Sequence, residues 1–138
     1  MKSADALLAT AREAAKTAHC PYSNFHVGAA VLCKDGSVVC GCNIENASYG
    51  LSMCAERVAL FNAKAQGKHP LAIAVSCTDA QDSGAMTSKM PCGACRQVMQ
   101  ELLPNDAQVH IDGVGTRALS QLLPEAFQLS SRPIDREA

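Results

Sequence analysis

The sequence contains few aromatic residues and has no marked excess of charge of either sign. Phenylalanine, tyrosine and tryptophan make up 4% of its 138 residues, tryptophan is absent, and the formal net charge is −1. Proteins that hold nucleic-acid strands present basic surfaces and aromatic side chains on which bases stack. The composition therefore argues against a nucleic-acid partner.

Long hydrophobic runs are also missing. No segment reaches the roughly 20 apolar residues that a membrane span requires. The first stretch, MKSADALLATAREAAK, lacks the apolar core and cleavage site of a secretory signal. These absences predict a protein without a membrane partner and with a cytoplasmic location, where the eight cysteines are expected to be reduced thiols.

The hydrophobic content, 48% of the residues, is sufficient for one domain over residues 1–138. Helical and strand patterns alternate around one apolar strand, which predicts an α/β fold with helices on both faces of a sheet. The polar tail 128–138 is expected to be flexible or ordered only against a partner. In chain order, the patterns predict a helix from Ser3 to before Pro21, a hairpin over 25–45, a helix over 54–65, a strand over 71–78, a helix over 91–103, a strand over 107–113 and a short helix over 118–127 interrupted near Pro124.

Three of the cysteines lie at predicted helix starts. Cys92 and Cys95 are three positions apart in MPCGACRQV, hence on one helix face, and Cys54 begins another helix. A CxxC pair alone is consistent with a redox dithiol, half of a zinc site or chance. Three sulfur ligands without an obvious fourth leave one tetrahedral position of a zinc ion open to water, as in catalytic sites. The remaining five are expected to pack as small hydrophobic residues: Cys20, Cys33, Cys40, Cys42 and Cys77.

Glu56 follows Cys54 by two positions. A carboxylate beside a zinc-bound water can take its proton and deliver it to a substrate, so Glu56 is the candidate general acid and base. Without the cysteines it would be an ordinary first-turn glutamate stabilised by the helix dipole. Arg57 follows the segment Cys54-Ala55-Glu56 and Arg96 follows Cys95, and each can donate hydrogen bonds to sulfur.

These segments together resemble a known family. Cys54-Ala55-Glu56 followed by Pro91-Cys92-Gly93-Ala94-Cys95 matches the three-cysteine form of the zinc deaminase signature. The blocks FHVGAAVL, GCNIENASYGLSMCAER, MPCGACRQVMQELLP and LLPEAF are similar to the short, homotetrameric cytidine deaminases over about residues 20–127. The resemblance implies a three-layer α/β/α sandwich with a mixed central sheet of about five strands. It also implies hydrolytic deamination of cytidine and deoxycytidine to uridine and deoxyuridine, with release of ammonia, in pyrimidine salvage.

The resemblance further implies a role for each matching residue. Cys54, Cys92 and Cys95 would bind one zinc ion per chain, and Glu56 would shuttle protons from zinc-bound water to the ring nitrogen and the departing amine. Val58, Met53 and the tail depart from the family's usual residues, which bears on substrate preference rather than chemistry. In binding a nucleoside substrate, Phe25 would stack on the pyrimidine, Asn43 and Glu45 would hydrogen-bond a ribose hydroxyl, Ala55 would contact the base through its backbone, and Tyr49 and Phe127 would complete the pockets of neighbouring subunits in a homotetramer.

Two alternatives accompany this reading. The same metal centre would also serve a deaminase of a modified cytosine nucleoside or a nucleoside antibiotic. A non-catalytic zinc-binding interaction module would instead need a fourth protein ligand. His26, His69 and His110 are the candidates for it, although none has a regular spacing to the cysteines.

Overall fold

The computed structural model describes residues 2–81 and 85–130. Its five strands form one sheet in the order β2-β1-β3-β4-β5. Strands β3 and β4 pair in parallel and the other neighbours pair antiparallel, so the sheet is mixed. The strands are β1 (Val27–Cys33), β2 (Val38–Cys42), β3 (Pro70–Cys77), β4 (Gln108–Ile111) and β5 (Gly115–Ala118).

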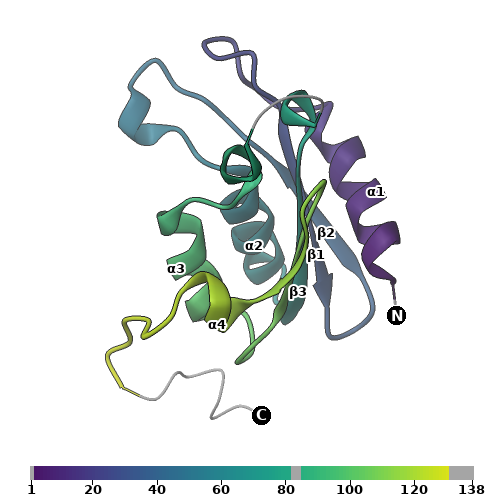
Figure 1. Ribbon diagram of the computed structural model, residues 1–138, viewed down its shortest axis with the longest axis vertical. Coiled ribbons are helices and arrows are strands. Elements are labelled where there is room, and N and C mark those ends of the chain that lie inside the picture. Colours follow the sequence, from purple (N-terminus) through teal and green to yellow (C-terminus); the bar gives the residue numbers. More distant parts are fainter. Residues whose placement is uncertain (1, 82–84, 131–138) are drawn as a thin grey trace.

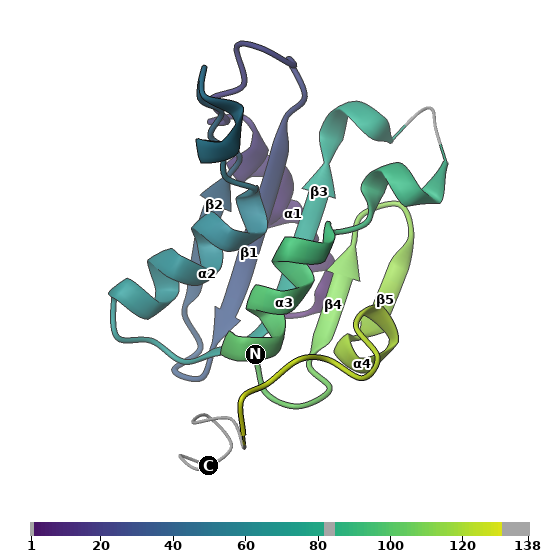
Figure 2. The same cartoon turned by 90° about the vertical axis from the view of Figure 1, so that its left-hand side faces the viewer.

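Helices cover both faces of the sheet (Figure 1), which confirms the predicted three-layer α/β/α fold. Helix α1 (Ala4–Ala15) lies on one face, and α2 (Ala55–Ala65), α3 (Gly93–Leu102) and α4 (Leu119–Leu122) lie on the other. Figure 2 shows α2 and α3 side by side in front of the sheet, with α1 behind it. Among the described residues, no helix has both the length and the apolar character of a membrane span.

Two glycines allow the helices to approach the sheet closely. A Cβ atom on Gly28 of β1 would lie 1.9 Å from the carbonyl oxygen of Ala11 in α1. A Cβ on Gly41 of β2 would lie 2.4 Å from the backbone nitrogen of Ala59 in α2. Any side chain at either position would push its helix outward, so glycine sets the spacing of the layers.

The main core lies between the sheet and α2 and α3, and includes Val31, Leu60, Ile73 and Met99, all fully buried. It supports the N-terminal ends of these two helices, where the candidate ligands lie. A smaller core around Leu7 joins α1 to the opposite face. The apolar sheet residues are thus covered on both sides, as the near-continuous apolar run in β3 predicts.

The structure differs from the predictions mainly near the C-terminus. It also differs at Cys40, which was expected to pack as a small hydrophobic residue but is exposed in the edge strand β2. Strand β5 was not predicted, and the helix predicted over 118–127 is wrong beyond Leu122. Leu123 has φ −144° and ψ 73° and ends α4, because a residue before proline is disfavoured in the helical conformation. Of the tail predicted to be flexible, residues 131–138 lie outside the described part of the chain.

Candidate metal centre and active site

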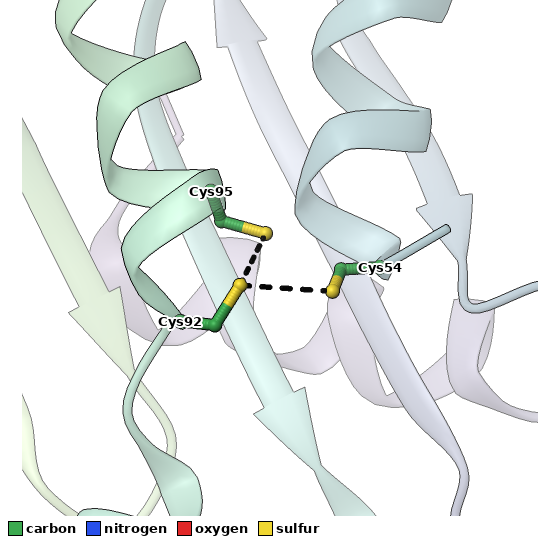
Figure 3. A group of neighbouring side chains, drawn as sticks. All are labelled: Cys54, Cys92 and Cys95. Carbon is green, nitrogen blue, oxygen red and sulfur yellow. Dashed lines mark hydrogen bonds between the residues drawn. The ribbon is translucent and has the colours of Figure 1, made fainter. Parts of the chain in front are cut away.

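The first turns of α2 and α3 bring the three predicted ligands together. Cys54 is the N-cap residue of α2, Cys92 is the N-cap residue of α3, and Cys95 lies in the first turn of α3. The sulfur of Cys92 is 3.9 Å from that of Cys54 and 3.5 Å from that of Cys95 (Figure 3). All three sulfurs lie within 4.8 Å of one another, so the CxxC pair and Cys54 form one cluster.

The sulfur positions fit a tetrahedral zinc ion. Zinc–sulfur bonds of about 2.3 Å at tetrahedral angles place two ligand sulfurs about 3.8 Å apart. The distances of 3.5 and 3.9 Å lie close to this value. The donors are also chemically suitable, since thiolates are preferred zinc ligands and both N-caps lie at the positive ends of helix dipoles.

The cluster offers zinc three protein ligands. Within the described part of the chain, Cys54, Cys92 and Cys95 form the only group of histidine, cysteine or acidic side chains that converges in this way. His26 Nδ1 instead lies 2.8 Å from Asp79, and His110 Nδ1 lies 2.7 Å from the Thr116 hydroxyl. His69 is likewise outside the cluster. None of the three candidate histidines supplies the fourth ligand that a structural zinc module would need.

Arg57 offsets part of the negative charge that three thiolates would create. Its Nη2 donates a hydrogen bond to Cys54 Sγ at 3.4 Å. Hydrogen bonds from Cys95 and from Arg57 lower the pKa of the Cys54 thiol. The pKa of Cys95 is raised, because it donates to Cys54 and is buried. Of this hydrogen-bonded pair, Cys54 is therefore the thiol that ionises more readily without metal, which prepares a thiolate for metal binding.

Glu56 is a buried acid beside this cluster. It lies in the first turn of α2, is 4% exposed, and lines the same cavity as Cys54 and Cys92. Burial, reinforced by the nearby Cys54 thiolate, raises the pKa of its carboxyl group to about 7. An acid with a pKa near neutrality can both accept and return a proton under physiological conditions.

The cavity has a volume of about 450 Å³, a size suited to a small molecule. Its wall carries four of the residues predicted to bind substrate, namely Phe25, Asn43, Glu45 and Ala55. Other parts of the wall were not predicted from the sequence. They are formed by Ser23, Val27, Ser52, Met53, Cys77, Ser88 and Met90.

Backbone contacts hold the polar side chains of this wall. Asn43 Oδ1 accepts the N–H of Val27 at 2.9 Å, and its Nδ2 donates to the carbonyl oxygen of Phe25 at 2.7 Å. The Glu45 carboxylate accepts the N–H groups of Tyr22 and Ser23 at 3.0 and 3.1 Å. It also accepts the Ser23 hydroxyl, and this bond lowers the pKa of Glu45. Both side chains are thereby fixed before any ligand binds.

Ser23 is a functional candidate that the sequence analysis missed. Its hydroxyl donates to Glu45 and accepts the N–H of Phe25 at 3.0 Å, so it connects two residues of the cavity wall. A local signal was available. Serine hydroxyls often accept the N–H two residues further on in a turn, and Ser23 precedes Phe25 by two in CPYSNF.

Tyr49 and Phe127 do not line this cavity in their own chain. They are 75% and 68% exposed. The Tyr49 ring meets that of Tyr22 edge-on, with the centroids 6.1 Å apart. The two aromatic side chains are therefore presented on the surface, Tyr49 in the short 3-10 helix Tyr49–Leu51 before α2 and Phe127 beyond α4.

A cluster of three cysteines that no fourth ligand side chain joins among the described residues, a buried acid and a ligand-sized cavity on an α/β/α sandwich are the features of a catalytic zinc protein. A family model described as the cytidine and deoxycytidylate deaminase zinc-binding region matches residues 1–111. The chain belongs to this family of zinc-binding deaminases.

Curated relatives and solved structures agree with this assignment. A cytidine deaminase of Halalkalibacterium halodurans is 46% identical over 125 residues, covering 88% of this chain and 91% of the relative. One from Mycobacterium tuberculosis is 44% identical over 131 residues, covering 94% and 93%. The crystal structure of a cytidine deaminase from Burkholderia pseudomallei superposes with a TM-score of 0.79 at 45% identity, covering 91% of this chain and 100% of that one.

Proposed function

We propose that the protein catalyses the hydrolytic deamination of cytidine and deoxycytidine to uridine and deoxyuridine, with release of ammonia. The observation that carries this proposal is the convergence of three cysteine sulfurs beside the buried carboxyl group of Glu56 in one ligand-sized cavity. The similar proteins from Halalkalibacterium halodurans and Mycobacterium tuberculosis, which are named cytidine deaminases, support the choice of substrate.

Cys54, Cys92 and Cys95 would hold one zinc ion per chain, with Arg57 donating to the Cys54 sulfur. When bound, zinc supplies a Lewis acid that brings the pKa of a coordinated water close to neutrality. The negative charge of three thiolates would raise the pKa of that water again. The positive helix ends and Arg57 offset part of this charge.

Glu56 would move the protons of the reaction. Its carboxylate accepts a proton from the attacking water and delivers it to ring nitrogen N3 of the cytosine. The water oxygen forms a bond to C4. Glu56 then passes the remaining proton of that oxygen to the amino group, and the C4–N bond breaks to release ammonia and leave the C4 carbonyl group. The pKa near 7 suits both directions of transfer, because neither protonation state is strongly favoured at neutral pH.

Other residues of the cavity wall would hold the nucleoside. Phe25 offers an aromatic face to the pyrimidine, and the backbone of Ala55 would contact the base. Asn43 can donate a second hydrogen bond from its amide, and the Glu45 carboxylate can accept one from a ribose hydroxyl. The sequence has no excess of basic residues, which fits a nucleoside substrate better than a nucleic acid.

We also propose that the active form is a homotetramer with shared pockets. The exposure of Tyr49 and Phe127, outside the cavity of their own chain, is consistent with each completing the pocket of a neighbouring subunit. Light scattering would test the assembly, and a monomer with full activity would contradict it.

A cytoplasmic location is proposed on the basis of the thiols. All eight cysteines are free, and free thiols persist in reducing compartments. Fractionation of cells that express the protein would test this location.

The function is tested by following the loss of the cytosine chromophore with cytidine, deoxycytidine, cytosine, cytidine monophosphate and a short oligonucleotide. We expect turnover of the two nucleosides and about one zinc ion per chain. A modified cytosine nucleoside is assayed in parallel, and its turnover in preference to cytidine and deoxycytidine would favour the alternative substrate class. Zinc-loaded protein inactive on every substrate would contradict the proposal.

A further inference from the structure

We propose that Arg96 is a positioning residue that holds the zinc-binding turn before α3 and the C-terminal segment of the chain at the same time. This inference rests on the proposed function and goes beyond it. From its place after Cys95, Arg96 was expected to be a donor to sulfur. In the structure its Nε and Nη1 groups donate instead to two backbone carbonyl groups on different segments.

The three sulfur ligands are restrained by different means. Cys95 is fully buried, so the surrounding core fixes its side chain. Cys54 receives the hydrogen bond from Arg57. Cys92 is exposed, and packing therefore restrains it least. A tetrahedral site needs all three sulfurs at fixed relative positions. The turn that carries Cys92 therefore requires another kind of support.

Arg96 provides that support. Its Nε donates to the carbonyl oxygen of Pro91 at 2.7 Å, and its backbone N–H donates to the carbonyl oxygen of Cys92 at 3.0 Å. Because the peptide unit is planar, a fixed Pro91 carbonyl also fixes the plane of the bond that leads into Cys92. One residue thus restrains the backbone on both sides of the Cys92 Cα atom.

The other end of the guanidinium group reaches the C-terminal segment. Nη1 donates to the carbonyl oxygen of Leu122, the last residue of α4, at 2.8 Å. The next residue, Gln97, donates through Nε2 to the carbonyl oxygen of Phe127 at 3.1 Å. The first turns of α3 therefore hold both ends of segment 122–127, which presents the aromatic ring proposed for a neighbouring pocket.

Arginine is suited to this task because its donors point in several fixed directions from one rigid plane. Lysine keeps the charge but concentrates its donors at one flexible point, so it cannot hold two separate carbonyl groups in the same way. This difference predicts a graded series of variants at position 96, with glutamine weaker than lysine and lysine weaker than arginine.

The test measures zinc affinity by competition with a chromogenic chelator, together with kcat and KM for cytidine. We expect Arg96→Gln to bind zinc about 10–100-fold more weakly than the wild type, and Arg96→Lys to lie between them. Gln97→Ala should keep wild-type zinc affinity but show a raised KM, since it loosens only the segment that ends at Phe127.

Arg12→Gln is the matched control. Arg12 also donates two hydrogen bonds, to Asp112 at 2.8 Å each, but it extends from α1 on the opposite face of the sheet. This variant should lower the thermal midpoint of unfolding while leaving zinc affinity and KM unchanged. It provides the reference for the effect on stability, zinc affinity and KM of losing an arginine with a structural role alone.

Arg96→Gln with wild-type zinc affinity and only a lowered thermal midpoint would overturn the proposal for the metal turn. An unchanged KM for cytidine in zinc-saturated Arg96→Gln would overturn it for the C-terminal segment, because the bond from Arg96 to Leu122 is lost in that variant. If Arg96→Gln does not fold by circular dichroism, Arg96→Lys is judged by the same criterion. A wild-type protein that binds zinc without deaminating cytidine would refute the proposed function, whereas the comparison of zinc affinities would still decide the role of Arg96.

Discussion

Two buried acids lie on opposite faces of the same sheet and have opposite titration behaviour. Glu56, beside α2, is 4% exposed, and Asp112, which contacts α1, is 6% exposed. Asp112 accepts two hydrogen bonds from Arg12 and one from Ser76 at 2.7 Å, and these hold its pKa below the usual range. Burial raises the pKa of Glu56 to about 7.

The difference shows that burial alone does not decide what a carboxyl group does. An acid that faces a guanidinium stays ionised and becomes part of the scaffold, linking α1 to the end of β4. An acid beside thiols and a cavity can exchange protons near neutral pH. The acid on the α1 face is therefore expected to stabilise the fold, and the acid on the face with α2 and α3 is expected to take part in the proposed chemistry.

The largest effect on activity is expected from removing one of the proposed zinc ligands, which lie on the face of the sheet that α2 and α3 cover. Cys95→Ser should bind far less than one zinc ion per chain and show no measurable deamination, because it removes a buried thiolate ligand. Metal analysis and the cytidine assay measure both quantities. Cys40→Ser, which alters a thiol outside the cluster, should retain zinc. Stoichiometric zinc in Cys95→Ser would exclude Cys95 as a ligand.

Exchanging each acid for its amide tests the comparison directly. Glu56→Gln should lower kcat by about 10²–10⁴-fold with zinc retained, because the proton shuttle is lost. Asp112→Asn should keep kcat near the wild-type value. Steady-state kinetics on zinc-loaded proteins provide the measurement. Equal losses of kcat in the two variants would remove the distinction between the faces.

Much of the fold could be predicted because its elements have strong local patterns. Ser3 accepts the N–H of Ala6 at 3.2 Å as the expected N-cap, and the hairpin turns at Gly36 with φ 87°. Strand β5 was missed because GTRA is short and lacks apolar alternation. Its extended conformation depends on pairing with β4, as in Val109 with Arg117, which local sequence does not reveal.

For the candidate site too, some features could be predicted from the sequence and others could not. The spacing of Cys54, Cys92 and Cys95 identified the cluster, since ligand type and helix position are both visible in the sequence. The bond from Arg96 to Leu122 could not be predicted, because it depends on where α4 lies against α3. The Arg12–Asp112 pair joins residues 100 positions apart, so only the assembled sheet brings them together.

In the metal-free protein, the free energy of unfolding should depend on pH because Glu56 titrates. The folded pKa of about 7 exceeds the unfolded value of about 4.3. The associated stabilisation is therefore complete below pH of about 4.3 and lost as the pH rises through about 7, by up to about 4 kcal/mol. Urea unfolding of metal-free wild type and Glu56→Gln between pH 5 and 8 should show a difference that changes with pH. A constant difference would contradict the raised pKa.

The smallest effect, with the opposite sign, is expected on the other face. Asp112 has a lowered pKa when folded, so its ion pair contributes stability above the unfolded pKa of about 3.9 and loses it as the pH falls through the folded value. Because Arg12 is 49% exposed, Asp112→Asn should cost only about 1–2 kcal/mol at neutral pH. Urea unfolding at neutral and acidic pH should show this cost shrinking below pH of about 4. If the cost instead grew on acidification, Asp112 would resemble Glu56, and the contrast between the two faces would fail.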